Sequence, residues 1–135
     1  MRREEAILDW EKLDQDEIAT EFDKRNGMLQ QMRGFFAMMR NLPFLIKDKR
    51  NRVLWANQAG ESLLGMRLHN LRGHKVSELL PNSPEWKDSQ KEINKVVQTK
   101  AARFQYHPGL PYATIRIPFY DEDGDMIIMV MHMKA

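Results

Sequence analysis

The fold is most narrowly constrained by residues 43–65, PFLIKDKRNRVLWANQAGESLLG, which combine two apolar runs, a charged turn and a capped helix. The runs at 44–46 and 53–55 are bulky or β-branched and are separated by polar turn formers, which predicts a β-hairpin. Asn57 then offers a side-chain oxygen to cap a helix, and Gly65 ends that helix. The expected order is therefore strand, turn, strand, helix.

This order resembles the opening of a PAS domain. The resemblance rests on a Pro and an apolar strand that ends in Lys-Asp (43–48), a strand that runs into Asn (54–57) and a helix that ends in Leu-Leu-Gly (63–65). It extends over about residues 42–134. The resemblance implies an α+β fold, a PAS-like five-stranded antiparallel sheet with flanking helices, whose last strand lies in mid-sheet. It also implies a sensory or interaction module.

One folded domain with an N-terminal appendage is the expected organisation. The chain of 135 residues can bury about two thirds of its unfolded surface, enough for one core. We expect a helical leader at 1–41 and a PAS-like domain at 42–135. No apolar run of about 18 residues or signal-peptide core is present, so no membrane contact is expected. The absence of Cys excludes disulfides and favours a reducing compartment, so we expect a cytoplasmic protein.

The leader is predicted to form an amphipathic helical segment in two parts. Residues 2–25 are rich in helix formers and carry acids in the first turn, and Asn26-Gly27 is a predicted stop. A second helix is predicted at 28–40 and ends before Pro43, because proline disfavours helical geometry in the preceding residue. Apolar residues recur along both parts at helical spacing, so the leader has an apolar seam that needs a partner surface.

After residue 65, segments with a weak secondary-structure pattern are followed by segments with a strong one. Residues 66–80 form a poorly periodic connector with one helical turn predicted at 76–80. Ser83 followed by Pro84 predicts the start of a helix that runs to about Gln98. Three strands are then expected from apolar alternation, with a turn before the last of them; they lie at 103–106, 114–119 and 126–133, and the turn is at 121–124.

The predicted last strand is apolar on both faces, which is typical of a central or covered strand. One face would pack on the helices, and we expect the leader to cover the other and to form a homodimer contact there. The alternative is that the leader covers the sheet within one chain and builds no dimer. The candidate dimer interface comprises Ile18, Phe22, Leu29, Met32, Phe36, Met39, Ile128 and Val130.

Catalytic or metal chemistry has little support in the sequence. The four His are scattered without ligand spacing, and no Gly-rich phosphate loop follows a strand. The acidic residues at 121–125 lack the Glu that an EF-hand loop needs at its twelfth position, where His132 stands. We therefore expect no enzyme activity, no catalytic residue and no metal site.

The resemblance raises three ideas about cofactors. Flavin adduct chemistry in related light-sensing domains needs a Cys, which this chain lacks, and haem-binding relatives usually ligate iron through a His on the long helix, which has none here. Neither cofactor is expected, which leaves a small organic ligand or a filled core. Arg116 alternates with Ile115 and Ile117, so we expect it to face away from them at the surface. The candidate cavity wall comprises Ile46, Leu63, Leu64, Ile93, Val97, Phe104, Tyr106, Ile115, Ile117, Ile127 and Met129.

These observations favour a sensory and homodimerisation domain that relays a signal to an effector domain or partner. The effector, such as a kinase, a cyclase or a DNA-binding domain that regulates transcription, is expected outside this sequence. A net charge of +2 does not support direct nucleic-acid binding. The alternative is a protein–protein interaction adaptor with a filled core and no small-molecule ligand.

Overall fold

The fold is taken from a computed structural model that describes residues 13–14, 16–20, 41–80, 88–121 and 123–134. Most of the predicted leader, including its second helix at 28–40, lies outside these residues. Ser83, the predicted start of the long helix of the domain, also lies outside them. No helix within the described ranges is long and apolar enough to span a bilayer.

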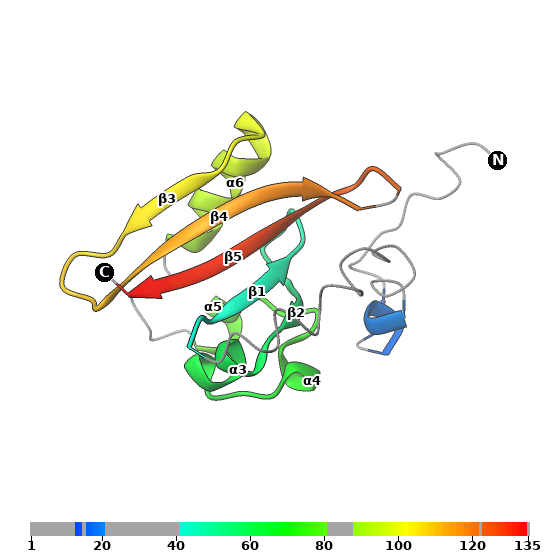
Figure 1. Cartoon of the computed structure of the whole chain (residues 1–135). Coiled ribbons are helices and arrows are strands. Elements are labelled where there is room, and N and C mark those ends of the chain that lie inside the picture. The colour runs from blue at the N-terminus through cyan, green and yellow to red at the C-terminus, as the bar shows by residue number, and fades with distance from the viewer. Residues whose placement is uncertain (1–12, 15, 21–40, 81–87, 122, 135) are drawn as a thin grey trace.

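A single five-stranded antiparallel sheet forms the centre of the molecule, as expected (Figure 1). Its strand order is β2-β1-β5-β4-β3, so the last strand pairs with the first and lies in mid-sheet. The two long strands, β4 and β5, pair along their whole length, and the shorter strands flank them. The bounds are β1 Phe44–Lys47, β2 Val53–Ala56, β3 Arg103–Tyr106, β4 Tyr112–Tyr120 and β5 Met126–Lys134.

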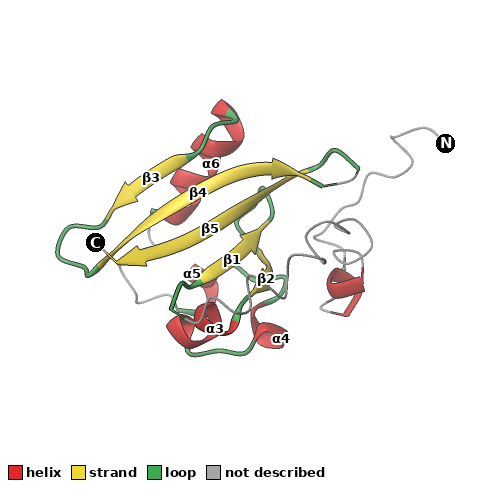
Figure 2. Cartoon of the chain, in the orientation of Figure 1, coloured by secondary structure: helices red, strands yellow, loops and turns green. Residues whose placement is uncertain are grey.

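Four labelled helices accompany the sheet in the described part of the chain. They are α3 Gln58–Leu64, α4 Leu68–Leu71, α5 Val76–Leu79 and α6 Ser89–Thr99. Figure 2 shows α3, α4 and α5 gathered beside β1 and β2, and α6 beside β3 and β4. The sequence did not predict α4. The helix α6 begins at Ser89, because the backbone of Asp88 lies outside helical geometry (φ −93°, ψ 1°).

Asn57 confirms the predicted cap and joins β1 to α3. Its Oδ1 accepts the N–H of Gly60 at 2.8 Å and that of Phe44 at 3.0 Å, and its Nδ2 donates to the carbonyl of Leu42 at 2.9 Å. The predicted stop is also present, because Gly65 adopts the left-handed conformation (φ 69°). One buried amide therefore fixes the start of the sheet against the first helix.

Apolar side chains pack on both faces of the sheet. We call the face that packs against α3–α6 the inner face. It carries Leu45, Ile128 and Val130, which cluster with Ile93 and Val96 of α6. The opposite, outer face carries a second buried cluster, which consists of Phe44, Ile46, Leu54, Trp55, Ile127 and Ile18. Both faces thus exclude water over β1 and β5, as the two-sided pattern of β5 predicted.

The described leader residues contribute to the outer cluster. Ile18 is buried in it and Leu13 packs at its border. Glu17 N–H donates to Asp14 Oδ1 at 2.8 Å, and Asp14 N–H donates to Glu17 Oε1 at 3.3 Å, which is a reciprocal cap before the helical residues 16–20. Because residues 13 and 14 are not helical, the predicted continuous helix over residues 2–25 is wrong.

Candidate functional site

The inner face carries a group of buried polar side chains at positions that are usually occupied by apolar core residues. We call Lys47, Thr114, Arg116 and His132 the polar layer. Thr114 pairs with His132, and Arg116 pairs with the core residue Val130, so these side chains share the inner face. Lys47 and Arg116 are each only 1% exposed. Buried charges are costly unless they are paired, so this layer demands a physical explanation.

Lys47 is held by the turn that follows β1. Its Nζ donates to Asn51 Oδ1 at 2.9 Å, and Asn51 Nδ2 donates to Ser89 Oγ at 2.9 Å. Asn51 adopts the left-handed conformation (φ 70°), which Asn tolerates better than most residues. Burial, together with repulsion by Arg116, lowers the pKa of Lys47 to about 7, although the charge of Asp48 acts in the opposite direction. The turn is thereby linked through Lys47 and Ser89 to both β1 and the start of α6.

Arg116 is the one cation of β4, and its side chain is buried. One of its terminal nitrogens donates to Gln105 Oε1 at 2.6 Å, and its Nε has no hydrogen-bond partner. Burial lowers the pKa of Arg116 to about 10, with Glu92 opposing the shift and Arg103 adding to it. The guanidinium is therefore charged at neutral pH. The expectation that Arg116 points away from the neighbouring isoleucines is confirmed, but its expected place at the surface is wrong.

Glu92 forms an ion pair with Arg103 and makes no hydrogen bond to Arg116. Arg103 Nε lies 2.8 Å from Glu92 Oε2. Burial alone would raise the pKa of Glu92, but the hydrogen bond and charge of Arg103, together with the charges of Lys95 and Arg116, leave the pKa below its usual value. This carboxylate is consequently ionised at neutral pH and already paired.

Two histidines share the hydroxyl of Thr114. His107 Nε2 lies 2.8 Å and His132 Nδ1 lies 3.0 Å from Thr114 Oγ1. A hydroxyl has one proton, so Thr114 can donate to one ring and accept from the other. Burial, with the charges of Lys47, Arg116 and His107, lowers the pKa of His132 to about 3. His132 is therefore neutral at physiological pH, and the charge of the layer resides in Arg116 and in the protonated fraction of Lys47.

The predicted cavity residues do not face one cavity. Leu64, Ile93 and Val97 belong to the inner core, whereas Leu63 is exposed at the outside of α3. The strand residues lie on the outer face instead, because their register partners belong to the outer cluster or border it; they are Ile46, Phe104, Tyr106, Ile115, Ile117, Ile127 and Met129. Whether any of the eleven contacts a ligand stays a prediction.

The candidate dimer residues are likewise divided. Ile18 lies in the outer cluster, as expected. Ile128 and Val130 are fully buried in the inner core, so their assignment to the outer face is wrong. The remaining candidates lie outside the described residues; they are Phe22, Leu29, Met32, Phe36 and Met39. The faces of β5 are thus the reverse of those expected.

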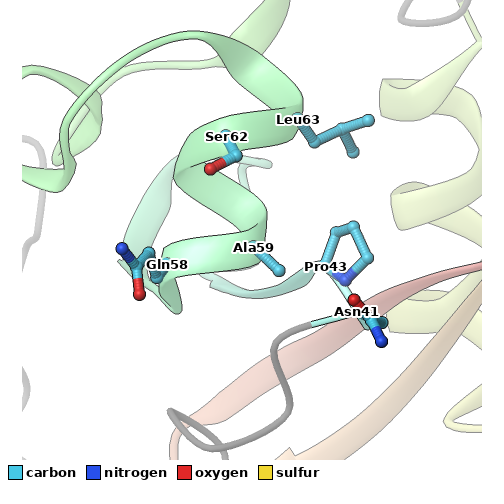
Figure 3. Close-up of a pocket in the computed structure, with 6 residues that line it drawn as sticks. All are labelled: Asn41, Pro43, Gln58, Ala59, Ser62 and Leu63. Carbon is cyan, nitrogen blue, oxygen red and sulfur yellow. The ribbon is translucent and has the colours of Figure 1, made fainter.

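Two of the surface grooves in the described part of the chain differ strongly in charge. One of about 730 Å³ separates α3 from the start of β1, with Ala59 opposite Pro43 (Figure 3). Its lining carries no titratable side chain; it consists of Asn41, Pro43, Gln58, Ala59, Ser62 and Leu63. The other, of about 470 Å³, is strongly basic and is lined by Lys49, Arg50, Arg52, Lys75, Glu78, Gln90 and Asn94. We call it the basic groove.

Sequence reasoning missed the polar layer because it assigned apolar residues to the core. The available signal was the position of these residues: Thr114 and Arg116 occupy alternate positions of one strand, and His132 lies opposite Thr114 in an antiparallel pairing. The members of the layer offer hydrogen-bond donors and positive charge. Among the described residues no three His, Asp or Glu side chains are grouped to hold a metal ion.

Comparisons with known proteins agree with this architecture. The sequence model of a family described as the PAS fold matches residues 40–134. The PAS domain of Bordetella pertussis BvgS is 18% identical, with a TM-score of 0.63 over 82% of this chain and 88% of that one. A sensory box sensor histidine kinase from Vibrio cholerae is 16% identical, with a TM-score of 0.57 over 81% of this chain and 95% of that one.

A third solved structure gives the same result. The PAS domain of nitrogen regulation protein NR(II) from Vibrio parahaemolyticus is 15% identical, with a TM-score of 0.55 over 73% of this chain and 96% of that one. No curated protein matches the chain significantly by sequence. The family match covers well over half of the chain, and the last strand of the five-stranded sheet lies in mid-sheet, as expected. The chain therefore belongs to the PAS-fold family.

Proposed function

We propose that this chain is a sensory signalling module that works as a homodimer and relays the state of its inner face to an effector domain or partner protein. The observation that carries the proposal is the difference in chemical character between the two faces of one sheet. The inner face holds buried, charged and hydrogen-bonding groups, and the outer face is apolar and receives leader residues. A change at one face can reach the other through strands that belong to both.

The solved structures support the signalling part of this proposal. Proteins with the same fold include a sensor histidine kinase from Vibrio cholerae and the histidine kinase ThkA. At identities below 20% these likenesses establish the fold alone. Because these two structures come from histidine kinases, we propose a kinase as the effector of this chain as well. We further propose that the module itself is non-catalytic and cytoplasmic.

The homodimer proposal rests on apolar surface that the described leader residues leave exposed. Phe104 and Tyr106 of β3 point to the outer face and are 60% and 61% exposed. Met131 and Met133 of β5 are half-buried on the same face. Exposed aromatic and thioether side chains at the edge of an apolar face are typical of interaction surfaces. A second copy of the chain is the proposed occupant.

Light scattering on the full chain at several concentrations tests this proposal. We expect twice the monomer mass of 16.0 kDa for the wild type and the monomer mass for Phe104→Glu. Tyr120→Glu is the matched control, because Tyr120 is also exposed but follows the inner-face register of β4. This control should remain dimeric. A wild-type chain that is monomeric at every concentration would contradict the homodimer.

An adaptor without a ligand is the second candidate, and the filled inner core favours it. Leu45, Ile93, Val96 and Val130 are all fully buried and in one cluster. Native mass spectrometry of the purified chain separates the two functions, since a small molecule retained at stoichiometric amount supports a sensor. A bare protein mass from gently purified chain supports the adaptor.

A further inference from the structure

The basic groove carries a surplus of positive charge. Its lining contains one carboxylate, Glu78, and four cations, which are Lys49, Arg50, Arg52 and Lys75. Arg52 is paired with Asp48 at 3.1 Å, and Glu78 Oε2 lies 3.7 Å from the ring of His74. Lys49 and Lys75 have no carboxylate within salt-bridge distance in the described part of the chain. A negatively charged partner would therefore be attracted to this groove.

The described leader residues form a surface of the opposite charge. Asp14, Asp16 and Glu17 are exposed, and we call them the acidic surface. Residues 4–23, which include them, contain nine acidic side chains and one lysine. No cation among the described residues lies within salt-bridge distance of the three carboxylates. A groove of about 240 Å³ beside them is lined by Leu13, Asp16, Glu17 and Thr20.

Ile18 attaches the acidic surface to its own chain without pairing it with the basic groove. Its side chain is buried in the outer cluster with Leu54 and Trp55 of β2. Its Cδ1 also lies so close to Gly73 that a Cβ added there would be only 2.9 Å away. Gly73 is two residues from Lys75 of the groove, yet no ion pair joins the described leader residues to the groove. Both charged surfaces are consequently available to another molecule.

The hydrogen-bonding groups of the basic groove suit carboxylates. Lysine and arginine donate charge-assisted hydrogen bonds to carboxylate oxygens. Asn94 Oδ1 accepts from Gln90 Nε2 at 2.9 Å, which leaves the amide nitrogen of Asn94 as a further donor on the groove. Exposed Asp and Glu side chains on a short helical turn match such a set of donors. The acidic surface of this same chain has that chemistry.

We propose that the acidic surface of one copy docks in the basic groove of a second copy, and that two-fold symmetry forms this contact twice in each dimer. The inference rests on the proposed homodimer and names the surfaces that orient it. The apolar outer face supplies most of the affinity, since exposed ion pairs contribute little energy. The charged contacts select the orientation, because wrong arrangements bring like charges together.

Sedimentation velocity on the full chain measures the effect of reversing each charge on the dissociation constant of the dimer. Asp16→Lys and Arg50→Glu each replace attraction by repulsion at both contacts, so each should raise this constant by about tenfold near 0.1 M salt. Both side chains are exposed, so the core stays intact. Arg67→Glu, which reverses an exposed arginine outside the basic groove, is the matched control and should leave the constant unchanged.

An equimolar mixture of Asp16→Lys and Arg50→Glu distinguishes contacts between copies from contacts within one chain. In the mixed dimer the lysine of one leader meets the glutamate of the other groove, and the second contact joins two wild-type surfaces. The mixture should therefore regain the wild-type dissociation constant to within about twofold. Charges that meet within one chain would stay mismatched after mixing.

Two results would overturn the docking. One is a dissociation constant that neither reversal changes, which would leave the homodimer of the outer face standing. The other is a mixture that stays as weakly associated as its components, because the charges would then act within single chains. A wild-type chain that is monomeric at every concentration would instead contradict the homodimer itself.

Discussion

At the scale of one residue, the burial of Lys47 makes the stability of the folded chain depend on pH. Its pKa is lowered from 10.5 to about 7 in the folded chain, so the unfolded chain binds more protons between these values. Stability from this residue is therefore greatest above pH 10.5 and is lost as pH falls towards 7. We predict that Lys47→Met removes this dependence, which amounts to at most about 1.4 kcal/mol per pH unit.

Urea denaturation between pH 7 and pH 10, followed by tryptophan fluorescence, measures the effect. The free energy of unfolding of the wild type should rise relative to Lys47→Met as pH increases. Lys49→Met, which removes an exposed lysine from the same turn, is the control and should follow the wild type. Parallel curves for the wild type and Lys47→Met would show that Lys47 is not buried as described.

Single residues were predictable where their role is local. Asn57 predicts a helix cap because its side-chain oxygen can accept a backbone N–H, and Gly65 predicts a helix end because glycine adopts the left-handed conformation readily; both predictions are confirmed. Arg116 was not predictable in the same way, because alternation groups residues by face without telling which face is buried by helices. A polar strand position was read as solvent-facing, and the structure places it inside.

At the scale of elements, β5 provides the clearest test of the face assignment. Ile128 is fully buried in the inner core, whereas Met131 is only half-buried on the outer face. We predict that Ile128→Ala lowers the free energy of unfolding by about 3 kcal/mol and that Met131→Ala lowers it by less than half as much. Equilibrium denaturation of both variants measures the difference. Equal costs would contradict the assignment.

The helices show why some elements escape prediction. The first N–H of α4, from Leu68, donates to Glu61 Oε2 of α3 at 2.7 Å. Its acceptor therefore lies in another helix, and Arg67, the residue before α4, makes no side-chain cap. A four-residue helix stabilised in this way leaves no periodic signal in the sequence. The strands and α3 were predictable because their patterns and caps are local.

At the scale of the whole molecule, the family resemblance carried by the succession of motifs was enough to predict a five-stranded antiparallel sheet with its last strand in mid-sheet. The family match and the solved structures confirm this part of the fold. The candidate site was not predictable from the same reasoning, since it depends on the register of β4 against β5 and on two separated segments that meet where Asn51 bonds both Lys47 and Ser89. Tertiary structure alone brings those residues together.

Hydrogen–deuterium exchange on wild type and Arg116→Met most directly tests the central claim, that the inner face and the outer face of the sheet are coupled. Arg116 touches only the inner side, whereas Ile18 packs on the outer cluster. We predict that the substitution changes exchange at least twofold in peptides covering residues 13–20 as well as in α6. Changes confined to α6, β3 and β4 would contradict the coupling.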